Sequence, residues 1–341
     1  MSKPNILLIY TGGTIGMLKD PTSGALKAFD FKSILKRIPE LRLLECNIKS
    51  VAFKDPIDSS NMQPKYWIAI AEIIEKKYAE FDGFVVLHGS DTMSYSASAL
   101  SFILEDLTKP VIFTGSQLPI GDLRTDAKEN LITSIQMAAL QDNGTSVIKE
   151  VGLYFEYKLY RGNRTTKINS EQFEAFDSPN YPHLAESGVH LNINSEFLRK
   201  PNSKAELKVN KKLNTNIGVL KLFPGISKPI VQAVLTAPNL KGLIIETYGS
   251  GNATTEPWFI EVLKSAIDKG IHIINVTQCV GGSVIMGQYE TSTDLKSIGV
   301  ISGKDITTEA AVTKLMYLLG HFEEVSDFKG VFERSLRGEM S

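Results

Sequence analysis

The feature that most constrains the fold is a repeated alternation between short, strongly apolar runs and stretches with helical spacing. Apolar, β-branched runs of this length are typical of strands that are buried on both faces of a sheet. Six of them stand out, at residues 6–9, 83–87, 110–113, 218–220, 242–245 and 271–274.

Between these runs, apolar residues recur at the spacing of one helix face. One such stretch covers 93–107, a second follows Pro64 at a first helical turn, and a third covers 312–319. Strands that alternate with helices predict an open, mostly parallel sheet with helices on both sides. The run at 151–155 adds a further strand.

The alternation lapses in a polar, lysine-rich stretch that Pro201 interrupts. A chain of 341 residues is long enough for two domains. We therefore expect an N-terminal α/β domain over 1–190, a connecting segment over 191–213 and a smaller C-terminal α/β domain over 214–341. The larger domain is expected to hold a flavodoxin-like sheet.

Charge and cysteine content exclude several classes of function. The formal net charge is −1, so the sequence offers no concentrated basic field for nucleic acid or an anionic membrane surface. Cys46 and Cys279 lie far apart, which predicts neither a disulfide framework nor a zinc knuckle. The apolar run near the N-terminus is too short for a secretory signal. We expect a cytoplasmic protein.

Small polar residues follow three of the predicted strands: TGGT at 11–14, HGSDT at 88–92 and TGSQ at 114–117. In an open parallel sheet, ligands bind outside the carboxyl ends of the strands, so these turns are expected to face one pocket. The glycines permit close approach of the backbone. The first turn lacks the full dinucleotide-binding pattern, and the sequence contains no P-loop.

A hydroxyl nucleophile needs a neighbouring base. His88 lies in a strand-like run and is interpreted as a core residue, Asp91 is equally suited to cap a helix, and Lys167 follows a Gly- and Thr-containing stretch that is also typical of a solvated basic loop. A lysine becomes a base when burial favours its neutral form. The residues alone thus indicate a hydroxyl-lined pocket, with the choice of base left open.

Taken together, the motifs resemble the bacterial type I asparaginases of the asparaginase/glutaminase family. They span nearly the whole chain and occur in the order and spacing of that family: TGGTIG at 11–16, DSSNM at 58–62, HGSDTMSYSASALSF at 88–102, TGSQLP at 114–119, LYRGNRTTK at 159–167, FPGIS at 223–227, YGSGNA at 248–253 and TQC at 277–279.

This resemblance implies hydrolysis of asparagine to aspartate and ammonia through a threonine ester, without metal or cofactor. It assigns the nucleophile to Thr14 and the second hydroxyl, acid and lysine to Ser90, Asp91 and Lys167. The segment Asp58, Ser59 and Ser60 is expected to bind the amino-acid end of the substrate, together with Ser90 and Asp91.

The resemblance also implies a homodimer or a tetramer built as a dimer of dimers, in which Asn252 reaches the site of another copy. One departure concerns the loop after the first motif, where Ala25 stands in place of the family's tyrosine. The alternatives are a glutaminase-asparaginase of broader specificity, an amidotransferase subunit, and a sensor that binds asparagine without catalysis.

Overall fold

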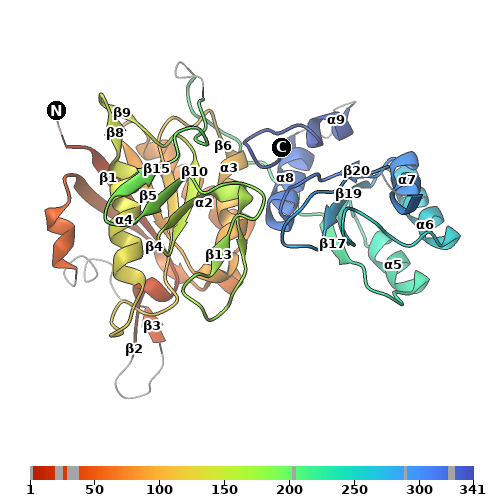
Figure 1. Cartoon of the computed structure of the whole chain (residues 1–341), viewed down its shortest axis with the longest axis horizontal. Helices are drawn as coiled ribbons and strands as arrows, with labels where there is room; N and C mark the ends of the chain where they lie inside the picture. The colour runs from red at the N-terminus through yellow and green to blue at the C-terminus, as the bar shows by residue number, and fades with distance from the viewer. Residues whose placement is uncertain (1–2, 20–25, 29–37, 202–204, 288–289, 322–326) are drawn as a thin grey trace. The chain divides into compact units, whose positions relative to one another are not determined.

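The computed structural model describes residues 3–19, 26–28, 38–201, 205–287, 290–321 and 327–341. Its contacts divide the chain into two compact units, Met1–Asn210 and Lys211–Ser341 (Figure 1). The division falls within the expected connecting segment 191–213. Part of that segment belongs to the first unit, because β15 (Leu191–Ile193) pairs with β14 (Ala185–Ser187).

The first unit contains an eight-stranded sheet in the order β15-β14-β11-β10-β7-β5-β1-β4. Neighbours from β4 to β10 are parallel, and the remaining pairs are antiparallel. The expected open and mostly parallel sheet is confirmed. The bounds of the strands not yet given are β1 Asn5–Gly12, β4 Asn47–Ile57, β5 Gly83–Leu87, β7 Val111–Thr114, β10 Val151–Phe155 and β11 Lys158–Arg161.

The parallel strands follow the flavodoxin-like order. From the edge inward, β4, β1, β5, β7 and β10 are the second, first, third, fourth and fifth of these strands along the chain. The chain passes from β1 to β4 on one side and then crosses to β5 on the other, so the direction reverses beside β1. At such a reversal the loops at the carboxyl ends diverge and leave a crevice for a ligand.

Helices cover both faces of this sheet, as expected. Helices α2 (Pro64–Lys77) and α3 (Met93–Ile103) pack on each other on the face of Phe84, whereas α4 (Ala127–Ala139) packs on the face of Ile6 and Val85. Helix α3 connects β5 to β7, and α4 connects β7 to β10. The chain therefore moves across the sheet in the same direction through both helices. Because they lie on opposite faces, the two crossovers have opposite hands, although nearly all such crossovers are right-handed.

The helix expected over 93–107 is shorter than predicted. It ends at Ile103, because Leu104–Glu105 forms β6 and pairs with β16 (Lys208–Val209). Leu104 is buried in this strand, so an apolar residue at this position fits the strand as well as it would fit a helix.

The second unit is built around a parallel sheet in the order β17-β18-β19-β20. Each strand lies beside the one that precedes it in the chain, so the strand order does not reverse. Helices that follow such strands gather on one face, and the chain places α5, α6 and α7 there and α8 on the other (Figure 1). The bounds are β17 Ile217–Lys221, α5 Lys228–Leu235, β18 Gly242–Thr247, α6 Pro257–Asp268, β19 His272–Thr277, α7 Glu290–Ser297, β20 Ile301–Ser302 and α8 Thr308–His321.

Short elements complete the two units. They are the hairpins β2 (Met17–Lys19) with β3 (Leu26–Ala28), β8 (Gln141–Asp142) with β9 (Thr145–Ser146) and β12 (Thr166–Lys167) with β13 (Phe176–Asp177), the helix α9 (Phe328–Phe332), and the 3₁₀ turns η1 (Thr14–Gly16), η2 (Pro39–Leu43), η3 (Ser59–Asn61), η4 (Ser90–Thr92) and η5 (Gly162–Arg164). Across the described ranges, every helix is too short or too polar to cross a bilayer.

Candidate active site

The carboxyl ends of β1, β4 and β5 touch one another through glycines. A Cβ atom on Gly13 would lie 2.5 Å from the backbone nitrogen of Gly89, and one on Gly89 would lie 2.5 Å from Oγ of Ser59. Gly13 also has φ near +88°, a conformation that other residues rarely adopt. These contacts bring Gly13, which precedes the half-buried Thr14, against Gly89, which precedes Ser90.

Two hydroxyls tie the same strand ends together. Oγ1 of Thr11 donates to the carbonyl of Leu87 at 2.9 Å, and Oγ1 of Thr92 donates to the carbonyl of Ser59 at 2.8 Å. The threonines and glycines of the quoted motifs therefore build the crevice. The turns therefore lie together, and the pocket that they are expected to face stays a prediction.

Lys167 reaches the same place from the hairpin of β12 and β13. Its Nζ donates to Oγ of Ser90 at 2.9 Å and to Oδ1 of Asp91 at 2.7 Å. The Lys167 side chain is 18% exposed and that of Asp91 is 63% exposed. Asp91 does not cap the following helix, because the residue at that position is Thr92.

The segment before Lys167 is not a solvated basic loop. Arg161 and Arg164 are buried. Nε of Arg161 donates to the buried carboxylate of Glu150 at 2.6 Å, and both guanidinium groups lie over the ring of Tyr181. A buried charge is tolerated when it is paired, and Glu150 supplies the partner from an earlier loop. This packing supports the hairpin that carries Lys167.

Gln117 belongs to this cluster, although no role is predicted for it from the motif that contains it. Its Oε1 accepts from Oγ of Ser90 at 3.1 Å, and its Nε2 donates to the carbonyls of Ser170 and Gln172 at 3.2 and 3.0 Å. The signal available in the sequence was its position, three residues after the end of a central strand.

Asp58, Ser59 and Ser60 follow β4 at the edge of the crevice. The backbone N–H of Ser60 donates to Oδ1 of Asp58 at 2.9 Å, and the Ser60 hydroxyl donates to the same oxygen at 2.8 Å. These two bonds, the backbone one first, hold the pKa of Asp58 below its usual range. The carboxylate is exposed and ionised, as a group that binds an ammonium must be.

His88 is a core residue, as interpreted from the sequence. It is fully buried, and burial lowers its pKa to about 4, so the imidazole is neutral at physiological pH. Its Nδ1–H donates to the carbonyl of Gly89 at 2.7 Å, and its Nε2 accepts from Ser96 Oγ at 2.9 Å. Trp67 in turn donates to Ser96 at 2.8 Å. This chain fixes the backbone directly before Ser90.

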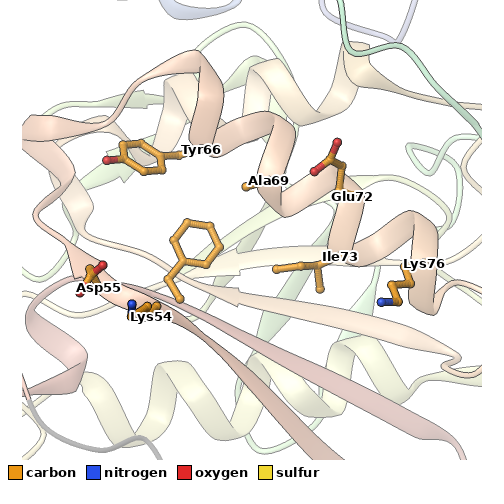
Figure 2. A pocket seen from close by; sticks show the side chains of 8 residues that line it. Lys54, Asp55, Tyr66, Ala69, Glu72, Ile73 and Lys76 are labelled. Carbon is orange, nitrogen blue, oxygen red and sulfur yellow. The ribbon is translucent and has the colours of Figure 1, made fainter.

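Two further features concern the residues that the structure describes. Within them, no three side chains of His, Cys, Asp or Glu gather in a way that could hold a metal ion. A separate groove of about 520 Å³ lies between β4 and α2, with Phe53, Tyr66 and Ile73 among its lining residues (Figure 2). Its lining contains no serine or threonine, so it offers no aliphatic hydroxyl of the kind that Thr14 and Ser90 provide.

Ala25 lies outside the described residues, so the structure does not address the position of the missing tyrosine. The turns that carry Thr14, Ser90 and Asp91 meet the segment 58–60 at the ends of β1, β4 and β5, and Lys167 contacts Ser90 and Asp91. Their chemical roles remain predictions.

Comparisons with known proteins agree with this architecture. Residues 5–199 match the family described as Asparaginase, N-terminal, and residues 216–332 match the Glutaminase/Asparaginase C-terminal domain. L-asparaginase 1 of Escherichia coli K12 is 43% identical over 100% of this chain and 99% of its own length.

Two further similarities are a 60 kDa lysophospholipase and a solved asparaginase. The Mus musculus lysophospholipase is 41% identical over 98% of this chain, which spans 62% of that protein. The crystal structure of L-asparaginase I from Vibrio cholerae superposes with a TM-score of 0.90 at 40% identity and covers 99% of both chains. The two domain matches and the full-length similarity show that this chain belongs to the asparaginase family.

Proposed function

We propose that the protein hydrolyses L-asparagine to L-aspartate and ammonia through an ester on Thr14. The observation that carries this proposal is the contact of Lys167 with Ser90 and Asp91, supported by the contact between Gly13 and Gly89, the residues that precede Thr14 and Ser90. The full-length similarity to proteins named L-asparaginase supports it.

In the first half-reaction, Oγ1 of Thr14 attacks the carboxamide carbon, the C–N bond breaks, and the amine leaves as ammonia with the threonine proton. Water then attacks the ester, releases aspartate and restores the hydroxyl. Backbone N–H groups near Ser90 are proposed as the oxyanion hole, where a donor is typically worth about 3 kcal/mol of barrier. Close placement of the reacting groups contributes further.

We assign proton transfer to Ser90, Asp91 and Lys167. In the resting structure Lys167 donates to Ser90, which donates to Gln117, because an amide oxygen only accepts. Transfer toward Lys167 therefore requires that its amine be neutral and that the Ser90 hydrogen turn from Gln117 to Lys167. Ordered water or another loop residue is proposed to polarise Thr14 in the absence of the usual tyrosine.

The amino-acid end of the substrate is assigned to the edge of the crevice. The carboxylates of Asp58 and Asp91 suit an ammonium, while the hydroxyl and backbone donors of Ser59 and Ser60 suit a carboxylate. A crystal structure with aspartate bound would check this orientation and would show which group lies within hydrogen-bond reach of Thr14.

The test is ammonia release from asparagine and from glutamine, measured side by side for the natural protein, Thr14→Ala and Thr14→Ser. We expect Thr14→Ala to lose at least about a thousandfold in kcat. Thr14→Ser keeps the hydroxyl and should retain part of the rate. A natural rate in Thr14→Ala would exclude the ester, and no ammonia from the natural protein would favour an asparagine sensor.

The same assay addresses the broader alternatives. One methylene in a pocket is worth only about 1 to 3 kcal/mol, so a glutaminase-asparaginase would release ammonia from both substrates at comparable rates. An amidotransferase subunit would prefer glutamine.

A homodimer or dimer of dimers is also a proposal, as is a cytoplasmic location. The second unit exposes large apolar side chains, among them Phe223, Ile230 and Ile285, which a second copy of the chain would cover. Both cysteines, Cys46 and Cys279, are free thiols, as is usual in a reducing compartment. Sedimentation analysis at several concentrations tests the assembly.

A further inference from the structure

We propose that Gln117 is a positioning residue: its amide holds the Ser90 hydroxyl at one end and the loop that follows Lys167 at the other. The proposal rests on the proposed function in so far as activity is one of its readouts. It gives a role to a residue that lies in a quoted motif, TGSQ at 114–117, but to which the proposed reaction assigns none.

The orientation of the Gln117 amide follows from its partners. Its nitrogen lies 3.2 Å from the carbonyl oxygen of Ser170 and 3.0 Å from that of Gln172, and carbonyl oxygens only accept. The nitrogen must therefore face this loop, and the oxygen must face Ser90, 3.1 Å away. One planar group thus uses both its donors and an acceptor to join two parts of the site.

The backbone of Gln117 is fixed as firmly as its side chain. The N–H groups of Gln117 and Leu118 donate to the buried carboxylate of Asp126, at 2.9 Å and 3.1 Å in their shortest contacts. Asn130 of α4 donates to that carboxylate and to the carbonyl of Gly115. The Gln117 side chain therefore extends from a point anchored to α4 and the end of β7.

The loop it reaches is exposed over most of its length. Lys167 pairs with Phe176 at the base of the hairpin, and the N–H groups of Ile168 and Asn169 both donate to the carbonyl of Ala175. Beyond that base, residues 169–172 are exposed. The two bonds from Gln117 fasten this outer part of the loop to the sheet and so restrict the hairpin that carries Lys167.

The other end of the amide sets the direction of the Ser90 hydroxyl. Because Oε1 of Gln117 accepts the Ser90 hydrogen, a lone pair of Ser90 Oγ is free to accept from Lys167, as observed. Rotation of the Ser90 hydroxyl about its Cβ–Oγ bond then turns its hydrogen from Gln117 Oε1 toward Lys167 Nζ. Neither Ser90 Oγ nor Lys167 Nζ has to move. Gln117 therefore keeps Ser90 and Lys167 at a distance suited to proton transfer.

Two variants with a matched control test this role. Gln117→Met has similar length but no hydrogen bonds, whereas Gln117→Glu keeps the acceptor for Ser90 and loses the two donors. Gln172→Met is the control, because it places the same side chain on the same loop at an exposed position. The readouts are hydrogen exchange of a peptide covering 168–175 and the pH profile of ammonia release.

We expect the peptide to exchange about tenfold faster in both Gln117 variants, as loss of hydrogen bonds of ordinary strength implies, and no change in Gln172→Met. We expect kcat to fall about ten- to a hundredfold with KM changed less than about threefold. In Gln117→Glu the acidic limb should also move to higher pH, because a second carboxylate near Lys167 favours its ammonium form.

Natural exchange and natural kcat in Gln117→Met would overturn the proposal, as would equal effects in Gln172→Met. Equal pH profiles for the Met and Glu variants would contradict the placement of the amide oxygen beside Ser90. If the natural protein releases no ammonia from asparagine, the proposed function fails, and the exchange data still decide whether Gln117 holds the loop.

Discussion

Each unit of the protein holds a lysine–carboxylate pair with more than one hydrogen-bond partner on the lysine. The two pairs differ in exposure and in the other partners of the lysine. Lys314 and Glu339 in the second unit are 0% exposed, and Nζ of Lys314 also donates to the carbonyls of Phe332 and Arg334 at 2.6 and 2.8 Å. Lys167 in the first unit is partly exposed, and its second partner is the hydroxyl of Ser90.

The difference teaches that the other partners of a lysine, rather than the ion pair, indicate its role. Carbonyl oxygens can accept hydrogen bonds but cannot pass a proton on, so Lys314 fastens the C-terminal segment to α8. The hydroxyl of Ser90 can exchange a proton, and it lies where the strand order reverses. The sheet of the second unit has no reversal, and there Thr247 and Asn275 bond to each other and hold the loop at Gly251.

The contrast between the two lysines fails if Lys167 only stabilises the fold and takes no part in the reaction. We expect Lys167→Met to lower kcat about a thousandfold, since a positioned acid–base group contributes about 10² to 10⁴. Its free energy of unfolding should change by less than about 1 kcal/mol, because the partner carboxylate of Asp91 is exposed. Ammonia release and urea unfolding measure the two quantities. Near-natural turnover would remove Lys167 from the reaction.

For Lys314 we expect a large effect on stability. Lys314→Met leaves the buried carboxylate of Glu339 without its cation, which we expect to cost about 3 to 5 kcal/mol in urea unfolding. The control is Lys264→Met, which removes the exposed pair with Asp268 and should cost less than about 0.5 kcal/mol. Equal costs for the two variants would show that burial does not distinguish the pairs.

Two glycines sharpen the comparison of the strand ends. Gly13 and Gly225 have φ near +88° and +91°, but a Cβ on Gly13 would meet Gly89, whereas one on Gly225 would meet nothing within 4 Å. Gly225→Ala should cost about 1 kcal/mol through its backbone alone. Gly13→Ala should cost about 2 kcal/mol more, because the two strand ends must separate. Thermal unfolding of both variants measures the difference between the two costs. Equal costs would show that the contact between Gly13 and Gly89 does not limit the substitution.

An effect confined to acidic pH separates His88 from His272. The pKa of His88 is lowered by burial to about 4, below the unfolded value of about 6.5. The folded state therefore binds fewer protons between these values, and stability falls by about 1 kcal/mol per pH unit as pH drops through this window. His88→Gln should flatten that part of the stability profile. His272→Gln should flatten it less, since His272 is only partly buried.

Several elements were predictable from local pattern. The runs that became β1, β5, β7, β18 and β19 are apolar because central parallel strands are covered on both faces. The run that became β17 was also predicted, although β17 is an edge strand in which only Leu220 is buried. The edge strand β4 was missed, since it has a neighbour on one side only and most of its residues stay at least partly exposed. The β11 segment was ambiguous, because nothing near Arg161 in sequence shows that Glu150 neutralises it.

The sequence by itself determined the fold class, the family resemblance and the glycines and hydroxyls that follow the central strands. Local pattern suffices there, because strand period and glycine geometry act over a few neighbouring residues. Only the tertiary structure decided that Lys167 faces Ser90 rather than solvent, and that Gln117 joins Ser90 to the loop after Lys167. Such contacts link residues far apart in the chain, and their geometry depends on how the sheet orders its strands.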